Sequence, residues 1–358
     1  MSTEATSAGA LGGGSGAPDG PVVARGPWHI AWARFRRDRV SVVAGVVFLA
    51  VLAACFVGAP LAAHLLGHGP NDPFPYAVDV NLRPVGPWTH VPDTNASIES
   101  PGGSTTTLFV LGADGQLGRD LFLRLLYGGQ VSLAIGIGAA LLALLIGVPA
   151  GIVSGYVGGW TDWTISRFTE LFMGFPLLLF LVSIGYTVGA RLSDVTLGGV
   201  AQPGVVALVF LIGVFSWFLP ARVIRAEVAS LRRHEFVEAA QMVGASDRWI
   251  MRKHVLPYLA APIVIWGTLM TASFVVFEAA ISVLNVGVQL PTPSWGNLLS
   301  TNWGTLLVFN PFRQTGEYYV ATSNWVVFWP TLFLFVAIVS LALLAEGVRR
   351  ALDPRGVA

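Results

Sequence analysis

Residues 234–257 read HEFVEAAQMVGASDRWIMRKHVLP and lie between two apolar runs that are each long enough to cross a membrane. Helical spacing puts Phe236, Ala240 and Val243 on one narrow stripe, which predicts a short amphipathic helix over the first half of the stretch. Gly244 supplies the stop for this helix. A short helix in a charged loop between two membrane spans is suited to being held by a partner on one side of the bilayer.

A second helix is predicted directly after this stop. Ser246 and Asp247 are good residues for its N-terminal cap and first turn. Its basic end suits the negative pole of the helix dipole and consists of Arg252, Lys253 and His254. Pro257 ends or kinks this helix where the next apolar run begins.

The composition is that of an integral membrane protein. Of the 358 residues, 54% are hydrophobic and only 11% are charged, against roughly 25% charged residues in soluble domains. The single cysteine, Cys55, rules out an internal disulfide framework, and the six histidines show no metal-ligand spacing. The only lysine, Lys253, follows Arg252, whereas a phosphate-binding P-loop needs Lys after Gly. Any nucleotide must therefore be bound by another polypeptide.

Six apolar runs are long enough to span about 30 Å of hydrocarbon. They cover residues 41–66, 131–154, 165–188, 204–221, 258–285 and 327–347. Six spans put both termini on one side, and the loop over 222–257 lies on that side too. All Lys and Arg residues fall on this side except Arg83, Arg119, Arg124, Arg191 and Arg313. The positive-inside rule makes this side cytoplasmic.

These runs divide the chain into five parts. Residues 1–27 form a disordered cytoplasmic tail, and 28–66 hold an Arg-rich interfacial helix, or a simple topogenic charge cluster, followed by the first span. Residues 67–130 are extracytoplasmic, 131–350 form a core of five spans, and 351–358 are a cytoplasmic tail. Leu52 to Cys55 look like a lipoprotein cleavage site, but the apolar run continues past Cys55, which disfavours a signal peptide.

The charged stretch resembles the EAA loop of permease subunits from bacterial ABC importers. The match rests on Glu238-Ala239-Ala240, Gly244 and Leu256-Pro257, although His254 stands where the family usually has an aliphatic residue. In that family the first short helix is a coupling helix that sits in a groove of a separate ATPase subunit. The resemblance thus implies an ATPase-coupling site made of Glu235, Phe236, Glu238, Ala239, Ala240, Val243, Gly244, Ala245, Leu256 and Pro257. The alternative is a cytoplasmic helix that merely joins two spans.

Four further segments resemble the C-type membrane subunit of dipeptide and oligopeptide transporters. They are Leu111 to Leu133, Gly155 to Asp162, Gly287 to Gly296 and Leu352 to Arg355. The resemblance implies an all-α fold with six transmembrane helices, that of a type I ABC importer permease in the bacterial inner membrane. It implies as partners a homologous second permease, two cytoplasmic ATPase subunits that hold ATP and magnesium, and an extracytoplasmic solute-binding protein. Such a chain is surrounded by membrane lipid. By this resemblance the chain itself binds no cofactor, metal or nucleic acid and carries no catalytic residue.

Glu278 is the clearest ionisable residue inside a span, where a charge costs about 2.5–3.5 kcal/mol. It is either a translocation-path or subunit-interface carboxylate, or a protonated or hydrogen-bonded helix-packing residue flanked by small side chains. Glu170 and Arg167 could pair on one helix face and are interpreted as structural, and Glu346 with Arg349 and Arg350 is interpreted as an interfacial anchor of the sixth span.

Three classes of function are considered. An ATP-driven importer subunit, with peptides as the expected substrate, leads. A stand-alone ion-coupled secondary transporter needs ion-binding groups at mid-membrane and often shows two related halves, and the sequence shows only Glu278 and no duplication. A membrane-embedded enzyme would need a cluster of intramembrane polar residues, and the sequence shows none.

Overall fold

The computed structural model describes residues 27–78, 84–92, 106–115, 117–185, 204–303, 307–308, 319–320 and 325–352. The predicted disordered tail before Pro27 lies outside the described residues, as does the C-terminal tail from residue 353. The same holds for residues 93–105 and for most of the second long exported stretch, 304–324.

Within the described residues, four uninterrupted helical stretches are long and apolar enough to cross a membrane. The first runs from Arg39 to Leu66 through α2 (Arg39–Ala53), a π-helical turn (Ala54–Gly58) and α3 (Ala59–Leu66). The other three are α5 (Leu121–Val157), α14 (Ala260–Val283) and α16 (Trp325–Leu352). Two bent helix pairs raise the number of spans to six if each pair counts as one. The mostly helical, multi-span fold predicted from the sequence is confirmed.

The third predicted span is not one continuous helix. It consists of α6 (Gly159–Met173) and α7 (Leu177–Ile184), which meet at an angle of 79°. The break falls at Gly174, Phe175 and Pro176, where the proline disfavours the helical conformation of the residue before it. The fourth span is likewise bent, by 42°, between α9 (Val205–Val214) and α10 (Phe218–Leu231), so it continues ten residues beyond the predicted end at 221.

The second span begins ten residues before the predicted start at 131. Asp120 caps α5, because its carboxylate accepts hydrogen bonds from the backbone N–H groups of Phe122 and Leu123. Residues 121–130, assigned above to the exported segment, therefore belong to this helix. At its other end α5 stops at Val157 and α6 begins at Gly159, so only a tight turn separates the second span from α6.

Helix α5 is the central helix and packs closely on α10. Gly147, Gly151 and Gly155 lie four residues apart on one face of α5. A Cβ atom added to any of them would lie 2.5–2.6 Å from a backbone oxygen of α10 or of Trp217 just before it. Small residues at this spacing let two membrane helices approach to backbone contact. This face of α5 therefore fixes the position of α10.

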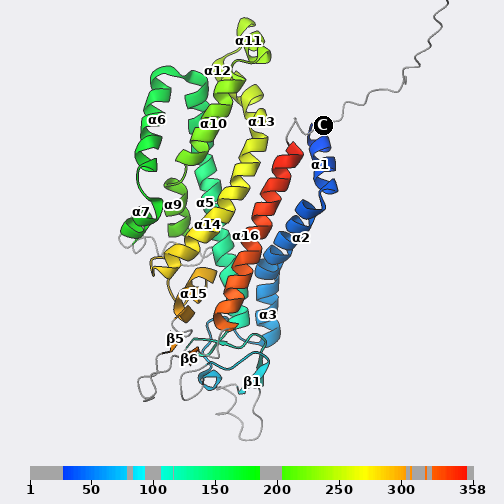
Figure 1. Cartoon of the computed structure of the whole chain (residues 1–358), viewed down its shortest axis with the longest axis vertical. Helices are drawn as coiled ribbons and strands as arrows, with labels where there is room; N and C mark the ends of the chain where they lie inside the picture. The colour runs from blue at the N-terminus through cyan, green and yellow to red at the C-terminus, as the bar shows by residue number, and fades with distance from the viewer. Residues whose placement is uncertain are drawn as a thin grey trace, which may run out of the picture.

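The two ends of the helical bundle differ in structure (Figure 1). At one end lie the N-terminal helix α1 (Pro27–Arg37), the C-terminal end of α16, and the helices α11 (Glu235–Met242) and α12 (Asp247–Ile250). At the other end are α15 (Trp295–Trp303) and short antiparallel strand pairs that the sequence did not predict. The strand pairs are β1 (Thr89–Pro92) with β2 (Thr106–Phe109), β3 (Ala113–Asp114) with β4 (Arg119–Asp120), and β5 (Leu307–Val308) with β6 (Tyr319–Val320).

Candidate functional site

Helix α11 forms where the sequence predicts it and ends as expected at Gly244. Gly244 has a φ angle of +85°, the left-handed conformation that glycine adopts without strain. The N–H of Gly244 donates to the carbonyl of Gln241, and the N–H of Ala245 donates to the carbonyl of Ala240. This pair of hydrogen bonds is a Schellman motif, which satisfies the last carbonyls of the helix and turns the chain sharply.

The second predicted helix also forms, but it does not end at Pro257. After α12 the chain continues through a π-helical turn, Met251–Val255, and one helical turn, α13, Leu256–Tyr258. The N–H of Leu256 donates to the carbonyl of Met251, five residues back, so the wider turn absorbs the irregularity that the proline causes. The helix axis is interrupted only at Leu259, and α14 begins at Ala260.

The buried face of α11 differs from the predicted stripe. Val237 is fully buried, and Phe236 and Ala240 pack partly against the same apolar cluster. Val243, predicted on this stripe, is 89% exposed, because it lies at the C-cap, where the helical period no longer applies. Met242 beside it is 83% exposed. The tip of α11 thus presents two large apolar side chains outward.

The remaining predicted coupling residues lie on α11, just after it, and on α13. Glu235, Glu238 and Ala239 are exposed on α11, and Ala245 is half-buried just after it. Leu256 and Pro257 are exposed on α13, away from the tip in sequence but joined to it through packing. Phe236 of α11 stacks on Tyr258 of α13 with a ring separation of 5.2 Å. The structure therefore brings the two halves of the motif into one unit.

Tyr156, near the C-terminal end of α5, connects this unit to the core, and the sequence analysis did not single it out. Its ring is buried, and its hydroxyl lies 3.2 Å from a carboxylate oxygen of Asp247 in α12. The side-chain amide of Gln241 in α11 donates to the same hydroxyl at 3.1 Å. Both short helices are thus hydrogen-bonded to one atom of the central helix. The cluster around Val237, Ile250 and Val255 adds apolar packing against α5 and α10.

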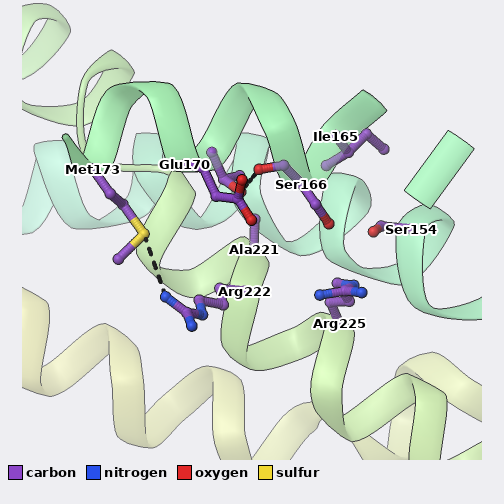
Figure 2. Close-up of a pocket in the computed structure, with 9 residues that line it drawn as sticks. Ser154, Ile165, Ser166, Glu170, Met173, Ala221, Arg222 and Arg225 are labelled. Atoms are coloured by element: carbon purple, nitrogen blue, oxygen red, sulfur yellow. Dashed lines mark hydrogen bonds between the residues drawn. The ribbon is translucent and has the colours of Figure 1, made fainter. Parts of the chain in front are cut away.

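A small polar pocket lies close by, between α6 and α10 (Figure 2). At its edge Arg225 of α10 forms two hydrogen-bonded contacts, of 2.5 and 2.7 Å, with Asp162 of α6. Ser154 of α5 lies 2.5 Å from the same carboxylate. The cavity measures about 70 Å³, far below the roughly 300 Å³ of an ordinary ligand pocket. Its residues therefore join three helices and do not form a substrate site.

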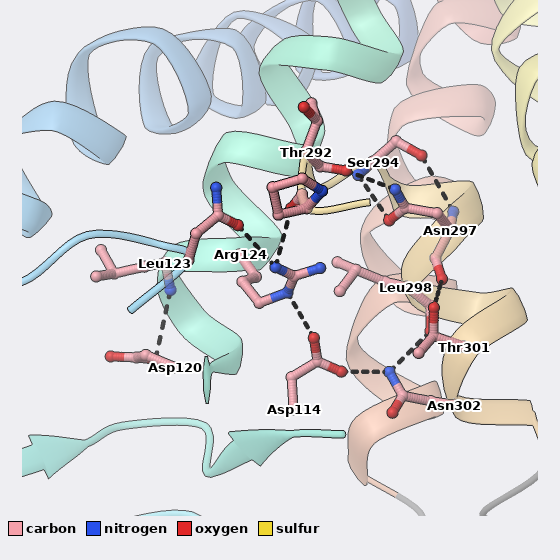
Figure 3. Close-up of polar contacts among 12 residues, drawn as sticks. Asp114, Asp120, Leu123, Arg124, Thr292, Ser294, Asn297, Leu298, Thr301 and Asn302 are labelled. Carbon is pink, nitrogen blue, oxygen red and sulfur yellow. Dashed lines mark hydrogen bonds and ion pairs between the residues drawn. The ribbon is translucent and has the colours of Figure 1, made fainter. Parts of the chain in front are cut away.

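A buried polar cluster ties together the opposite end of the molecule (Figure 3). Arg124 of α5 forms a 2.5 Å ion pair with Asp114 of β3, and both side chains are at most 2% exposed. The Arg124 guanidinium also donates to Asn71, at 2.9 Å, and to the carbonyl of Pro291. Asn302 of α15 donates to Asp114. The guanidinium of Arg124 and the carboxylate of Asp114 thus hold α5 and β3 together with the segments around Asn71, Pro291 and Asn302.

His68 adds a titratable group beside this cluster. Its Nε2 atom lies 3.1 Å from the carboxylate of Asp120, and its Nδ1 atom lies 3.1 Å from the carbonyl of Leu66. Burial lowers the pKa of His68, but the hydrogen bonds to Asp120 and Leu66 and the charges of Asp120 and Asp72 outweigh it. The pKa of His68 therefore lies above its ordinary value of 6.5.

Glu278 is enclosed within the chain. Its carboxylate accepts hydrogen bonds from Ser132 of α5 at 2.7 Å and from Ser282 one turn further along α14 at 2.8 Å. The backbone N–H of Trp295 donates to the Ser132 hydroxyl, which links α15 to the same network. In this conformation Glu278 acts as a hydrogen-bonded packing residue. Its role on a translocation path stays a prediction.

The predicted pair of Arg167 and Glu170 forms, with the two side chains 2.7 Å apart. Glu346 contacts both Arg349 and Arg350, and the role of these three residues as an interfacial anchor stays a prediction. Arg350 also pairs with Asp38, the N-cap of α2, at 3.0 Å, so it joins the first and last spans. In the part of the chain that the structure describes, no group of three or more His, Cys, Asp or Glu side chains is arranged to hold a metal ion.

Comparison with known sequences decides the family. Residues 147–356 match the profile described as "Binding-protein-dependent transport system inner membrane component". The chain belongs to this family. Residues 26–84 match a second profile, the N-terminal transmembrane domain of oligopeptide transport permease C. A binding-protein-dependent inner membrane component is a multi-span transport subunit, in agreement with the apolar helices described above.

Two curated relatives cover nearly the whole chain. The oligopeptide transport system permease protein OppC of Haemophilus influenzae is 30% identical over 331 residues, which are 92% of this chain and 89% of that protein. The glutathione transport system permease protein GsiD of Pectobacterium atrosepticum is 28% identical over 92% of both chains. Among solved structures, one of the MetNI methionine ABC transporter in an inward-facing conformation matches 64% of this chain and 96% of its own, with 17% identity and a TM-score of 0.45.

Proposed function

We propose that this chain is one permease subunit of an ATP-driven importer of the type I architecture, and that it imports short peptides or peptide-like molecules such as glutathione. The substrate class follows from the relatives, which are named for oligopeptide and glutathione transport. A homologous second permease forms the other half of the path, two ATPase subunits bind beneath the membrane, and a solute-binding protein delivers substrate from outside.

The observation that carries this proposal is the structure of the segment from α11 to α13, residues 235–258, called here the α11 unit. Its tip presents Met242 and Val243 to solvent, an apolar pair that a partner groove would cover. The same unit is fastened to the central helix through Tyr156 and through the cluster around Val237. A push on the tip would thus reach α5 and α10 directly. A helix that only joined two spans would need neither feature.

The proposed coupling role also requires one end of the molecule to face the cytoplasm. The α11 unit, α1 and the C-terminal end of α16 lie at one end of the molecule, and this is the end that the distribution of Lys and Arg assigns to the cytoplasm. The strand pairs and α15 at the other end would then meet the solute-binding protein.

The test uses two glycines with the same backbone conformation. Gly244 ends α11, and Gly67 ends α3 at the other end of the molecule, with φ angles of +85° and +75°. A Cβ atom added at either position meets no neighbouring atom within 4 Å. Alanine therefore costs about 1–2 kcal/mol of local backbone strain at both sites and causes no clash within the chain.

We expect Gly244→Ala to lower substrate-stimulated ATP hydrolysis by the reconstituted complex, and Gly67→Ala to leave it unchanged. Assembly of the complex, checked by size-exclusion chromatography, should survive both substitutions. Equal hydrolysis in both variants would contradict the coupling role. Uptake of peptide by the chain alone in proteoliposomes under an ion gradient would favour the secondary transporter instead.

A further inference from the structure

An apolar groove on the outside of the molecule is lined by residues of α1, α2 and α16. These three helices lie together at the end of the molecule that carries α11 (Figure 1). Its volume is about 660 Å³. Trp32 of α1, Val46 of α2 and Leu344 of α16 are among the residues that line it. Trp32 and Val46 are each about 60% exposed. The groove is therefore large, apolar and uncovered by any described part of the chain.

The α2 and α16 walls of the groove fit the depth of one leaflet of a bilayer. Its α2 wall extends from Val42 to Leu49, and its α16 wall extends from Leu344 to Leu352. At a rise of 1.5 Å per residue these walls are roughly 10 to 12 Å long, while half of the hydrocarbon core is about 15 Å thick. A partner helix that crosses the membrane would need a groove along the full length of the span. An acyl chain of one leaflet needs only this depth.

The groove lining includes one charged side chain. Arg36, in the last turn of α1, lines the groove and is exposed. No Asp or Glu within the described ranges forms an ion pair with Arg36, whereas Arg350 nearby is paired with Asp38 and Glu346. The guanidinium of Arg36 is therefore available to an anion such as the phosphate of a lipid headgroup.

We propose that this groove binds an anionic phospholipid of the cytoplasmic leaflet, with the phosphate at Arg36 and one acyl chain between α2 and α16. The bound lipid holds α1 against α16 by filling the space between them. The site requires this end of the molecule to face the cytoplasm, but it does not require coupling to an ATPase. The lipid site and the coupling role can therefore fail separately.

The test measures lipid retention by native mass spectrometry of the purified full-length chain, titrated with dioleoyl phosphatidylglycerol or dioleoyl phosphatidylcholine. We expect the wild-type chain to retain phosphatidylglycerol over phosphatidylcholine by roughly five-fold, the effect of one arginine near a membrane surface. Val46→Trp fills the groove and should abolish the retained lipid. The matched control is Leu65→Trp, which places the same side chain at the far end of the same span, where Leu65 is 76% exposed. It should retain lipid as the wild type does.

Arg36→Gln should bring the two lipids close to equal retention without removing the bound acyl chain. Undiminished phosphatidylglycerol on Val46→Trp would overturn the proposal, as would equal retention of both lipids by the wild type. Loss of a co-purifying membrane subunit from Val46→Trp with unchanged lipid would show that the groove holds a partner helix instead. Should Val46→Trp fail to fold, an unchanged lipid preference in Arg36→Gln would by itself refute the site.

Discussion

Replacing Tyr156 with phenylalanine removes one hydroxyl and leaves the buried ring in place. The hydroxyl accepts a hydrogen bond from Gln241 and donates one to Asp247, and it thereby joins α11 and α12 to α5. A hydrogen bond contributes about 0.5–1.5 kcal/mol net, and more where one partner is charged. Because Gln241 and Asp247 are exposed, water replaces part of the loss in the variant. We therefore expect the link to weaken by about 1–2 kcal/mol, a factor of roughly 5 to 30.

The assay is the ratio of peptide imported to ATP hydrolysed by the complex in proteoliposomes. We expect Tyr156→Phe to lower this ratio several-fold while basal hydrolysis and assembly stay as in the wild type, since under the proposed coupling role α11 would keep its surface for the ATPase but move α5 less effectively. Tyr258→Phe is the matched control, because Tyr258 stacks on Phe236 and its hydroxyl has no hydrogen-bond partner among the described residues. A transport ratio that is the same in Tyr156→Phe and in the wild type would refute the transmission through Tyr156.

Three further predictions concern stability, measured by thermal unfolding of the purified chain in detergent. Asp114→Asn leaves the buried Arg124 without its counter-charge and should lower the free energy of unfolding by about 3–5 kcal/mol. Glu170→Gln, in the exposed pair with Arg167, should lower it by under about 1 kcal/mol. Similar losses in the two variants would contradict a stabilising role for the buried cluster. Because the pKa of His68 in the folded chain lies above its ordinary value of 6.5, the stability that His68 contributes is complete below pH 6.5 and is lost as the pH rises through the folded pKa. His68→Gln should remove this dependence of the free energy of unfolding on pH. If the same pH dependence persists in the variant, another group causes it. Gly151→Ala places a methyl group 2.6 Å from the Ala221 carbonyl and should destabilise the chain by about 1–3 kcal/mol. Gly45→Ala, whose added atom lies 3.5 Å from Leu344, should not destabilise it. Equal stability of the two variants would argue against close packing of α5 on α10.

The sequence predicts best what is local. The α11 helix, its stop at Gly244 and the start of α12 follow from residues within a few positions of one another, and all three are confirmed. The early start of α5 and the break between α6 and α7 were not predicted, although both have local signals in the sequence. Asp120 before an apolar run signals a helix cap, and the Gly-Phe-Pro at 174–176 signals a break.

The contacts that carry the proposed mechanism are long-range and could not be predicted from one sequence. Tyr156 is 85 residues from Gln241 and 91 from Asp247. Arg124 belongs to a segment that the resemblance identified, yet nothing in the spacing shows that it pairs with Asp114 or reaches Asn71. Glu278 was recognised as an intramembrane carboxylate, but its enclosure by Ser132 and Ser282 depends on how α5 and α14 pack.

The coupling assignment requires the tip of α11 to face the cytoplasm and to be covered by an ATPase. Val243 is almost fully exposed, and the only native cysteine, Cys55, is buried, so a Val243→Cys variant carries a single reactive thiol at the tip. A membrane-impermeant maleimide should label this thiol in inside-out vesicles that lack the ATPase subunits, and adding those subunits should protect it. Labelling of Val243→Cys in intact cells would place α11 outside and contradict the account.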